Sequence, residues 1–265
     1  MSGAHIVIDG VSKVFNTDGR ELIALQDIHL VIPHGQFTCL LGPSGCGKST
    51  LLNAVAGFAL PTRGTILADG RAVTAPGPER GMVFQEYALF PWMTVEANVA
   101  FGLEIKGMPK AAIAARVSDL LKMLSLWDFR QRFPKDLSGG MRQRVAIARV
   151  LALDSPIMLM DEPFGALDAL TRRNLQDELL RIWSALKKTV IFVTHSIEEA
   201  LYLADRIVVM TYRPGSVKRD IMVELPRMRD PASPQFNALK RELGQLVMEE
   251  QQRHHNDELR SAGVD

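Results

Sequence analysis

Residues 42–50 read Gly42-Pro43-Ser44-Gly45-Cys46-Gly47-Lys48-Ser49-Thr50, and they directly follow the apolar run Phe37-Thr38-Cys39-Leu40-Leu41. A Gly-rich loop between a strand and a helix lets successive backbone N–H groups point at phosphate oxygens, and the positive end of the helix strengthens that attraction. The spacing is that of a P-loop, which predicts a site for a nucleoside triphosphate. An ordinary Gly-rich turn is disfavoured by the strand in front and the helix-forming run 51–55 behind.

The polar residues of this loop have separate expected tasks. Lys48 reaches the β and γ phosphates, Ser49 places its hydroxyl on Mg²⁺, and Thr50 helps to hold the phosphate chain. Cys46 is interpreted as a small loop residue without a redox role. The predicted phosphate-binding residues are Gly42, Pro43, Ser44, Gly45, Cys46, Gly47, Lys48, Ser49 and Thr50.

Composition excludes several functional classes. The chain has 265 residues, is 47% hydrophobic and carries a formal charge of +1 from 31 basic and 30 acidic residues. It therefore predicts a globular protein without the basic footprint of a nucleic-acid binder. The two cysteines, Cys39 and Cys46, form no disulfide framework and suit a reduced, cytoplasmic compartment. No run approaches the roughly 20 apolar residues that cross a bilayer, and the N-terminus lacks a signal-peptide pattern. We therefore expect a chain that neither spans a membrane nor is exported, and that can dock on a membrane protein.

Hydrophobic periodicity predicts an α/β fold. It is a P-loop NTPase core with an N-terminal antiparallel β-subdomain and an inserted α-helical subdomain at about 94–153. Asp69-Gly70 predicts a hairpin turn after the strand 64–68. The expected strands are 5–8, 11–15, 22–25, 28–32, 37–41, 64–68, 156–160, 190–193 and 206–210.

The C-terminal segment, residues 227–265, is expected to form a helical tail after a catalytic domain at 1–226. Its apolar positions fall on one helical face, and packing on the core is the expected role of that face. Those positions are Phe236, Leu239, Leu243, Leu246 and Val247. His254-His255 lies in a polar run without the spacing of a metal site, so no metal is assigned there.

A pair of carboxylates extends the phosphate chemistry. Asp161 and Glu162 directly follow the apolar strand 156–160. An Asp in this place can hold Mg²⁺, while the next carboxylate can orient or deprotonate the attacking water. We therefore predict Asp161 as a metal ligand and Glu162 as the catalytic base.

The stretch Leu137-Ser138-Gly139-Gly140-Met141-Arg142-Gln143-Arg144 resembles the signature motif of the nucleotide-binding subunit of ATP-binding-cassette transporters. Its Ser138, Gly139 and Gly140 precede a helix and make a second anion cradle. The resemblance implies a head-to-tail dimer in which this cradle closes on the nucleotide of the other copy. Met141 departs from the commonest signature, which has Gln there; the backbone cradle survives this change.

The same resemblance assigns further residues in the family's order. Phe15 matches the aromatic residue that stacks on adenine, and Gln85 matches the glutamine that contacts Mg²⁺ and senses the γ-phosphate. Asp168 matches the loop that crosses the dimer, and His195 matches the catalytic histidine at the γ-phosphate. With Glu162 and Lys48, His195 completes the predicted catalytic set, and the implied cofactors are ATP and Mg²⁺.

The segment 86–93 and the motifs around Asp161 look most like importers of nitrate, taurine and other sulfonates. In that family this segment forms the groove that receives a short helix of the membrane subunit. Leu89, Phe90 and Trp92 are therefore candidates for permease docking, with ordinary core packing an equal alternative.

The implied partners are a second copy of this chain, integral membrane permease subunits and, indirectly, a periplasmic solute-binding protein, but no nucleic acid. The expected place is the cytoplasmic face of the bacterial inner membrane. Two alternatives stay open at this point: a P-loop kinase, and a cassette ATPase that acts in nucleic-acid or ribosome assembly.

Overall fold

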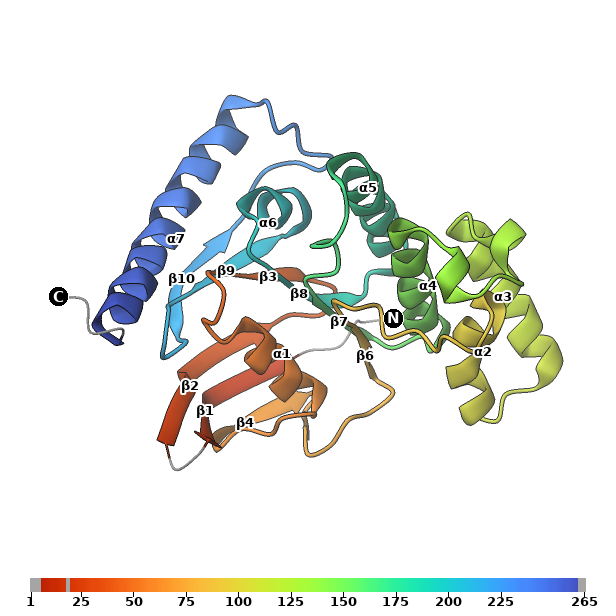
Figure 1. Ribbon diagram of the computed structural model, residues 1–265, viewed down its shortest axis with the longest axis horizontal. Helices are drawn as coiled ribbons and strands as arrows, with labels where there is room; N and C mark the ends of the chain where they lie inside the picture. The colour runs from red at the N-terminus through yellow and green to blue at the C-terminus, as the bar shows by residue number, and fades with distance from the viewer. Residues whose placement is uncertain (1–5, 18–19, 262–265) are drawn as a thin grey trace. The chain divides into compact units, whose positions relative to one another are not determined.

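Two units divide the chain, Met1–Pro76 with Thr189–Asp265, and Gly77–Lys188. The computed structural model describes residues 6–17 and 20–261. Strands and helices alternate in both units, which confirms the predicted α/β class (Figure 1). The predicted domain division at residue 226 and the subdomain limits near 94 and 153 stay predictions.

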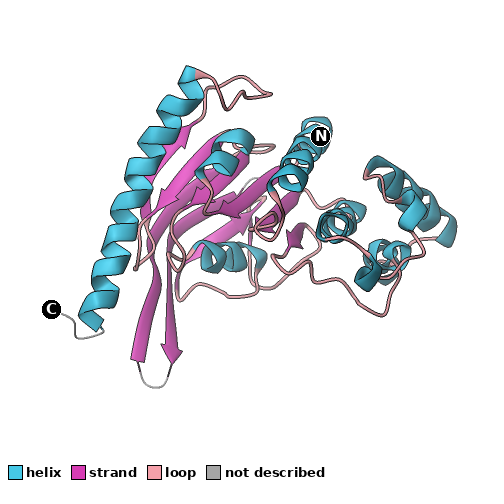
Figure 2. Cartoon of the chain, turned by 45° about the horizontal axis from the view of Figure 1, so that its top comes forward, coloured by secondary structure: helices cyan, strands magenta, loops and turns pink. Residues whose placement is uncertain are grey.

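The first unit contains an antiparallel sheet built on two long strands, β1 (Ile6–Thr17) and β2 (Arg20–Ile32). They lie side by side in Figure 2. Each replaces two of the predicted short strands, because register shifts between Ile8 and Val14 absorb the interruption without ending β1. β4 (Arg63–Ala68) pairs with β1 and with β5 (Arg71–Ala72).

The hairpin between β4 and β5 confirms the prediction from Asp69-Gly70. Asp69 has φ 48° and Gly70 has φ 72°. Two consecutive positive φ angles are the requirement of a two-residue hairpin turn, which is why Asp-Gly favours it.

The second sheet of this unit runs in the order β10, β9, β3, β8. β3 (Phe37–Leu41) pairs in parallel with β8 (Thr189–Thr194) and β9 (Arg206–Met210), and β10 (Val217–Met222) is antiparallel to β9. Every residue of β3 and β8 is buried, as expected for parallel strands covered on both faces. The helices of this unit are α1 (Lys48–Ala56), α6 (Ile197–Leu203) and α7 (Pro234–Ser261).

α7 forms where the sequence predicts an amphipathic C-terminal helix, and it lies along β10 in Figure 1. Phe236, Leu243 and Val247 are buried, so the predicted face packs on the protein. The carboxylate of Glu250 lies on the same side, where it accepts hydrogen bonds from Lys218 Nζ at 2.6 Å and from the Tyr212 N–H at 2.9 Å. Burial opposes ionisation of Glu250, but these hydrogen bonds outweigh it and lower its pKa.

The second unit pairs β6 (Arg80–Val83) in parallel with β7 (Ile157–Asp161). Helix α4 packs against β6 and three helices of the same unit. The helices of this unit are α2 (Val95–Ile105), α3 (Lys110–Met123), α4 (Gly139–Ala152) and α5 (Ala169–Leu186), with short 3₁₀ turns η1 (Trp127–Phe129) and η2 (Pro134–Asp136). In residues 6–17 and 20–261 no helix has the length and apolarity needed to cross a bilayer.

Arg229 joins the segment before α7 to the end of α6. Arg229 is 4% exposed, and its guanidinium donates to the carbonyl oxygens of Leu201 at 2.5 Å and Ala204 at 2.6 Å, at the C-terminal end of α6. It also donates to the carbonyls of Val223 and Leu225, each at 3.2 Å. Burial and the neighbouring Arg227 lower the pKa of Arg229 to about 10, which leaves it charged at neutral pH.

Replacing this side chain leaves buried carbonyl groups without donors. We expect Arg229→Met to lower the free energy of unfolding by about 3 kcal/mol, measured by urea denaturation. The exposed Arg241 on α7 provides the control, and Arg241→Met should stay within about 0.5 kcal/mol of the parent. Equal unfolding midpoints for the two variants would contradict the role of Arg229.

Candidate functional site

The P-loop occupies the turn between β3 and α1, as predicted. Gly45 and Gly47 have φ of 77° and 94°, a left-handed conformation that glycine adopts without strain. Gly47 is the N-cap residue of α1, so the helix begins with the loop still wrapped around its N-terminal end. Backbone N–H groups of this first turn have no partner within the helix, which is the arrangement that attracts phosphate.

Lys48 lies inside this loop. It is 4% exposed, and its Nζ donates to the carbonyl oxygens of Gly42 and Pro43, each at 2.8 Å. The Cys46 sulfur lies 3.7 Å from the same nitrogen. Burial raises the pKa of the Cys46 thiol although Lys48 opposes the shift, so this cysteine lacks the lowered pKa of a reactive thiol.

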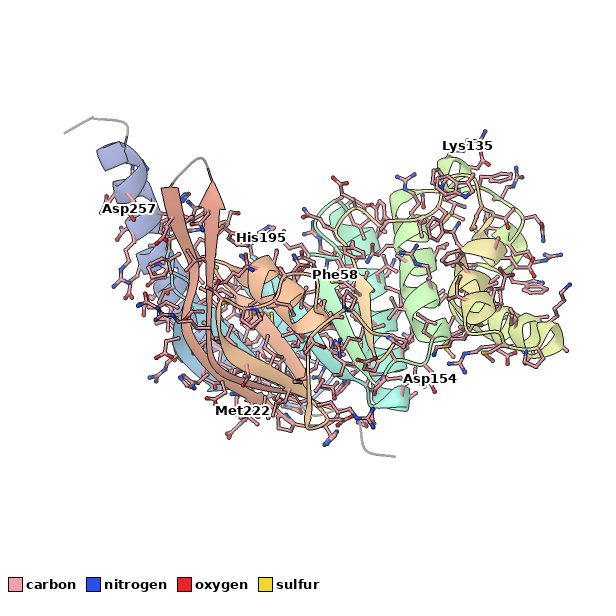
Figure 3. All side chains as sticks on the ribbon, turned by 90° about the horizontal axis from the view of Figure 1, so that it is seen from below. Phe58, Lys135, Asp154, His195, Met222 and Asp257 are labelled. Carbon is pink, nitrogen blue, oxygen red and sulfur yellow. The ribbon has the colours of Figure 1, made fainter. Side chains whose placement is uncertain are left out.

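His195 follows β8 at the edge of the sheet where the P-loop follows β3. Leu41 faces Thr194 in the parallel register, so the residues after both strands emerge side by side. His195 is exposed, and it is labelled in Figure 3. The flanking backbone is fixed because Thr194 Oγ1 donates to buried Glu199 at 2.6 Å and accepts the Ser196 N–H at 2.9 Å. The structure thus brings the predicted histidine to the edge that carries the P-loop.

Phe15 lies on β1 and is 38% exposed. Lys13 Nζ lies 5.2 Å from the centre of its ring. Strand aromatics usually pack in a core, whereas this ring is accessible for stacking, as the predicted contact with adenine requires.

The loop Thr211–Ser216, which we call the support loop, packs directly on the P-loop. Arg213 Nε donates to the carbonyl of Gly45 at 3.3 Å. Gly215 lies so close that a Cβ atom on it would stand 2.2 Å from the carbonyl oxygen of Cys46. The sequence analysis missed Arg213 and Gly215, because no local sequence pattern indicates a contact between segments that are 168 positions apart.

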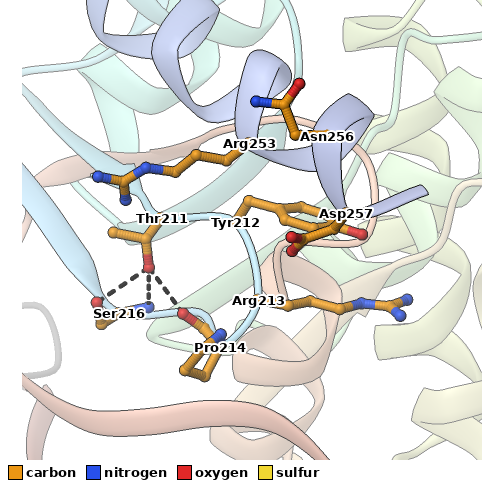
Figure 4. Close-up of a pocket in the computed structure, with 8 residues that line it drawn as sticks. All are labelled: Thr211, Tyr212, Arg213, Pro214, Ser216, Arg253, Asn256 and Asp257. Carbon is orange, nitrogen blue, oxygen red and sulfur yellow. Dashed lines mark hydrogen bonds between the residues drawn. The ribbon is translucent and has the colours of Figure 1, made fainter. Parts of the chain in front are cut away.

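Figure 4 shows the support loop beside the last turns of α7. Thr211 Oγ1 donates to the Pro214 carbonyl at 2.8 Å and accepts the Ser216 N–H at the same distance, which closes the loop on itself. The rings of Tyr212 and His254 lie 4.4 Å apart, and a cavity of about 500 Å³ opens between the loop and α7. The C-terminal helix therefore buttresses the loop that contacts the P-loop.

In the second unit the predicted polar residues gather at the carboxyl ends of β6 and β7. Val83 faces Met160 in the parallel register, so Gln85, two residues after β6, and Asp161, the last residue of β7, lie at neighbouring strand ends. Glu162 comes next and has φ 41°, an unusual conformation for a residue with a side chain. Residues in such strained conformations are concentrated at functional positions. Here the positive φ changes the direction of the chain directly after β7.

The signature residues begin α4, and the Asp168 loop begins α5. Ser138 Oγ accepts the Met141 N–H at 3.3 Å, and Asp168 Oδ1 accepts the Thr171 N–H at 3.0 Å, so each caps its helix. The Thr171 hydrogen bonds lower the pKa of Asp168. A Cβ atom on Gly140 would stand 2.6 Å from the Thr171 side chain, so the two helix starts touch.

The segment after Gln85 leaves Trp92 70% exposed. Its ring lies 5.7 Å from that of Phe90, which lies 4.6 Å from Phe101 in α2. Leu89 and Phe90 are half-buried. Trp92 is therefore the most exposed of the three predicted docking residues. Among the residues described, no cluster of three or more His, Cys, Asp or Glu could hold a metal by itself.

Comparisons with known proteins point to one family. The family described as ABC transporter matches residues 25–165. The taurine import ATP-binding protein TauB of Roseobacter denitrificans is 51% identical over 77% of this chain and 76% of its own length.

Two further relatives extend the match. The aliphatic sulfonates import ATP-binding protein SsuB of Bacillus cereus is 45% identical over 90% of this chain and 94% of its own length. The nitrate import ATP-binding protein NrtD of Synechocystis sp. is 44% identical over 90% of each chain.

A solved structure shares the fold. It is the dimeric, post-hydrolysis state of an ATP-binding cassette bound to ADP and Pi, with a TM-score of 0.74 and 33% identity. The match covers 83% of this chain and all of that one.

The contact between the support loop and the P-loop is testable. Because the Cβ atom of an alanine at 215 would displace the Cys46 peptide, we expect Gly215→Ala to weaken ATP binding by about tenfold to about a hundredfold. The measurement is a titration with a fluorescent ATP analogue.

Gly244→Ala on α7 is the matched control, because a Cβ atom there meets nothing within 4 Å, and its ATP affinity should equal that of the parent. If Gly215→Ala also binds ATP normally, the support loop does not determine the shape of the P-loop.

Proposed function

This chain belongs to the ABC transporter family, and from that premise we propose that it is the ATPase subunit of an importer for a small anion such as taurine, another aliphatic sulfonate or nitrate. The observation that carries the proposal is the identity of 44–51% with three import ATP-binding proteins whose names specify these anions. All three compounds are small and carry a sulfonate or nitrate group, whose negative charge is spread over oxygen atoms. ATP binding and hydrolysis coupled to transport are the activity of this family.

The residues take the following roles in the proposed reaction. The P-loop and Lys48 hold the β and γ phosphates of ATP, and the exposed ring of Phe15 stacks on adenine. Glu162 accepts the proton of the attacking water, and His195 polarises the γ-phosphate and keeps that water aligned. Water attack breaks the bond between the γ-phosphorus and the bridging oxygen, and ADP leaves with Pi as the second product.

The chain offers a donor set that fits Mg²⁺. The Ser49 hydroxyl, the Gln85 amide oxygen and the Asp161 carboxylate are all hard oxygen ligands, which this ion takes. When bound, Mg²⁺ neutralises charge that develops on the phosphates. The position of Asp161 at the end of a buried strand supports its place in this set.

The proposed assembly contains two copies of this chain. In the head-to-tail arrangement, Ser138, Gly139 and Gly140 close on the nucleotide of the partner copy, and Asp168 lies in the loop that crosses between copies. The dimeric state of the solved cassette bound to ADP and Pi supports this assembly. Closure of the two copies drives integral membrane permease subunits, and a periplasmic solute-binding protein delivers the anion. The chain acts at the cytoplasmic face of the bacterial inner membrane.

Glu162→Gln separates binding from chemistry. Because the amide cannot accept the proton of water, we expect kcat for ATP hydrolysis to fall by about 10² to 10⁴-fold while ATP affinity is retained. Size-exclusion chromatography with MgATP should then show an accumulated dimer. Undiminished hydrolysis in this variant would contradict the role of Glu162.

Uptake of labelled anions tests the transport function itself. Cells that lack this chain should lose uptake of taurine, an alkanesulfonate or nitrate, and the wild-type chain, but not Glu162→Gln, should restore it. Normal uptake of all three anions in the depleted cells would overturn the proposed substrate class. Transfer of the γ-phosphate to a small acceptor instead of water would favour a kinase, and recovery with ribosomes would favour an assembly factor.

Trp92 provides a separate test of permease docking. Loss of an exposed aromatic contact at the centre of an interface costs about 2 kcal/mol or more, so Trp92→Ala should weaken permease binding by more than about tenfold. Co-purification from detergent-solubilised membranes measures the effect, and ATPase activity of the isolated chain should not change. Phe129→Ala, at another exposed aromatic of the same unit, is the control. Equal permease recovery with both variants would exclude Trp92 from the interface.

A further inference from the structure

The turn that follows Gln85 has an unusual backbone. Tyr87 has φ 60° and Ala88 has φ 47°, so two consecutive residues with side chains occupy the left-handed region. Steric contact of Cβ with the backbone disfavours this region for all residues except glycine. Such a turn persists only where its surroundings hold it in place.

Arg149, in the last turn of α4, contacts both residues of this turn. Its Nη1 donates to the Ala88 carbonyl at 2.6 Å and its Nη2 to the Tyr87 carbonyl at 3.4 Å. The guanidinium also lies 5.6 Å from the centre of the Phe90 ring. Burial lowers the pKa of Arg149, so this cation is partly withdrawn from water and directed at the turn. A guanidinium is planar and carries its N–H donors on separate nitrogens in a fixed fork, so it can donate to two adjacent carbonyls at once.

The first turn of α4 contacts the Tyr87 side chain. Arg142 lies 5.4 Å from the centre of the Tyr87 ring and donates to the Leu137 carbonyl at 2.8 Å. The Tyr87 hydroxyl stands 3.3 Å from the position that a Cβ atom on Gly139 would take. Because Arg142 and Arg149 are seven positions apart, they share one face of α4. The turn after Gln85 is thus attached to the signature helix at both ends.

We propose that Arg149 is a positioning residue, whose guanidinium holds the Tyr87–Ala88 turn in its left-handed conformation and, together with Arg142, joins the glutamine loop to the signature helix as one element. The inference rests on the proposed function and deepens it. Gln85 senses the γ-phosphate bound by its own chain, whereas Ser138 and Gly139 bind the nucleotide of the partner copy. Through Arg149 and Tyr87, occupancy of one site sets the orientation of the other, and the same element carries Phe90 and Trp92 toward the permease.

The test begins with Arg149→Met, which keeps the length of the side chain and removes the donors. We expect kcat for ATP hydrolysis to fall by about tenfold or more, with KM for ATP within about threefold of the parent because the P-loop is untouched. ATP-dependent dimerisation in a Glu162→Gln background should weaken in parallel. Arg149→Lys should restore part of kcat, because an ammonium group still donates to one carbonyl.

Ala88→Gly makes the test specific to the backbone conformation. Glycine adopts positive φ without the Cβ penalty, so this change removes the strain at one of the two left-handed residues, and the turn depends less on Arg149. The double variant Ala88→Gly with Arg149→Met should therefore regain kcat to within about threefold of Ala88→Gly alone. Arg181→Met is the matched control, because Arg181 is an exposed arginine on α5 of the same unit and lies outside the signature stretch. Its kcat should stay near that of the parent, and Ala88→Gly should not alter it.

The outcomes separate the inference from the function on which it rests. The positioning role is wrong if the wild-type chain hydrolyses ATP and Arg149→Met has the same kcat. It is also wrong if the kcat of Arg149→Met falls and Ala88→Gly does not restore it. In both cases the ATPase function stands. If the wild-type chain itself hydrolyses no ATP, the proposed function fails. Circular dichroism checks that each variant is folded. If Arg149→Met does not fold, kcat of Arg149→Lys and of the double variant decides whether the positioning role holds.

Discussion

The parallel register of β3 and β8 is the constraint on which the nucleotide chemistry of the first unit depends. Because Leu41 faces Thr194, the P-loop and His195 leave the same edge of the sheet. Both strands are buried over their whole length, so a slip in register would carry a continuous apolar run out of the core. The core therefore fixes where the phosphate-binding backbone and the histidine emerge from the sheet.

Helix α4 has a corresponding role in the second unit. Its first turn carries the Ser138 cap and the signature glycines, and three cations donate to the carbonyls at its other end: Lys106 to Leu153 at 2.9 Å, Arg116 to Ala152 at 2.6 Å, and Lys188 to Asp154 at 3.2 Å. The dipole of a helix is stabilised by positive charge at its C-terminus and by an anion at its N-terminus. The three cations therefore complement the C-terminal end of α4, while its N-terminal end favours an anion. Arg116 is on α3, whereas Lys106 directly follows α2 and Lys188 lies two residues after α5. The packing of these helices therefore places the positive charge at the C-terminal end of α4.

The sequence predicted the position of the P-loop turn and of the β4–β5 hairpin well, because their physics is local. A P-loop needs glycine at particular steps of one turn, and a two-residue hairpin turn needs two positive φ angles, which Asp-Gly supplies. Both requirements are met within a few residues, and the structure shows the positive φ angles at these places. The short N-terminal strands were predicted less well, because the bulges that keep β1 continuous depend on pairing with β2 and β4. The sequence also did not decide whether Phe15 and Trp92 are exposed, since a single aromatic residue can lie in a core or on a surface.

The sequence by itself determined the family of this protein, through the order in which the P-loop glycines and lysine, the Ser-Gly-Gly stretch and the paired carboxylates follow one another. Only the tertiary structure decided which residues hold these groups in place. Arg213 reaches Gly45 across 168 positions, and Arg149 reaches Ala88 across 61. An arginine on an amphipathic helix has the same appearance in a sequence whether it meets water or the carbonyl of a strained turn. The difference arises when packing brings distant segments within hydrogen-bond distance.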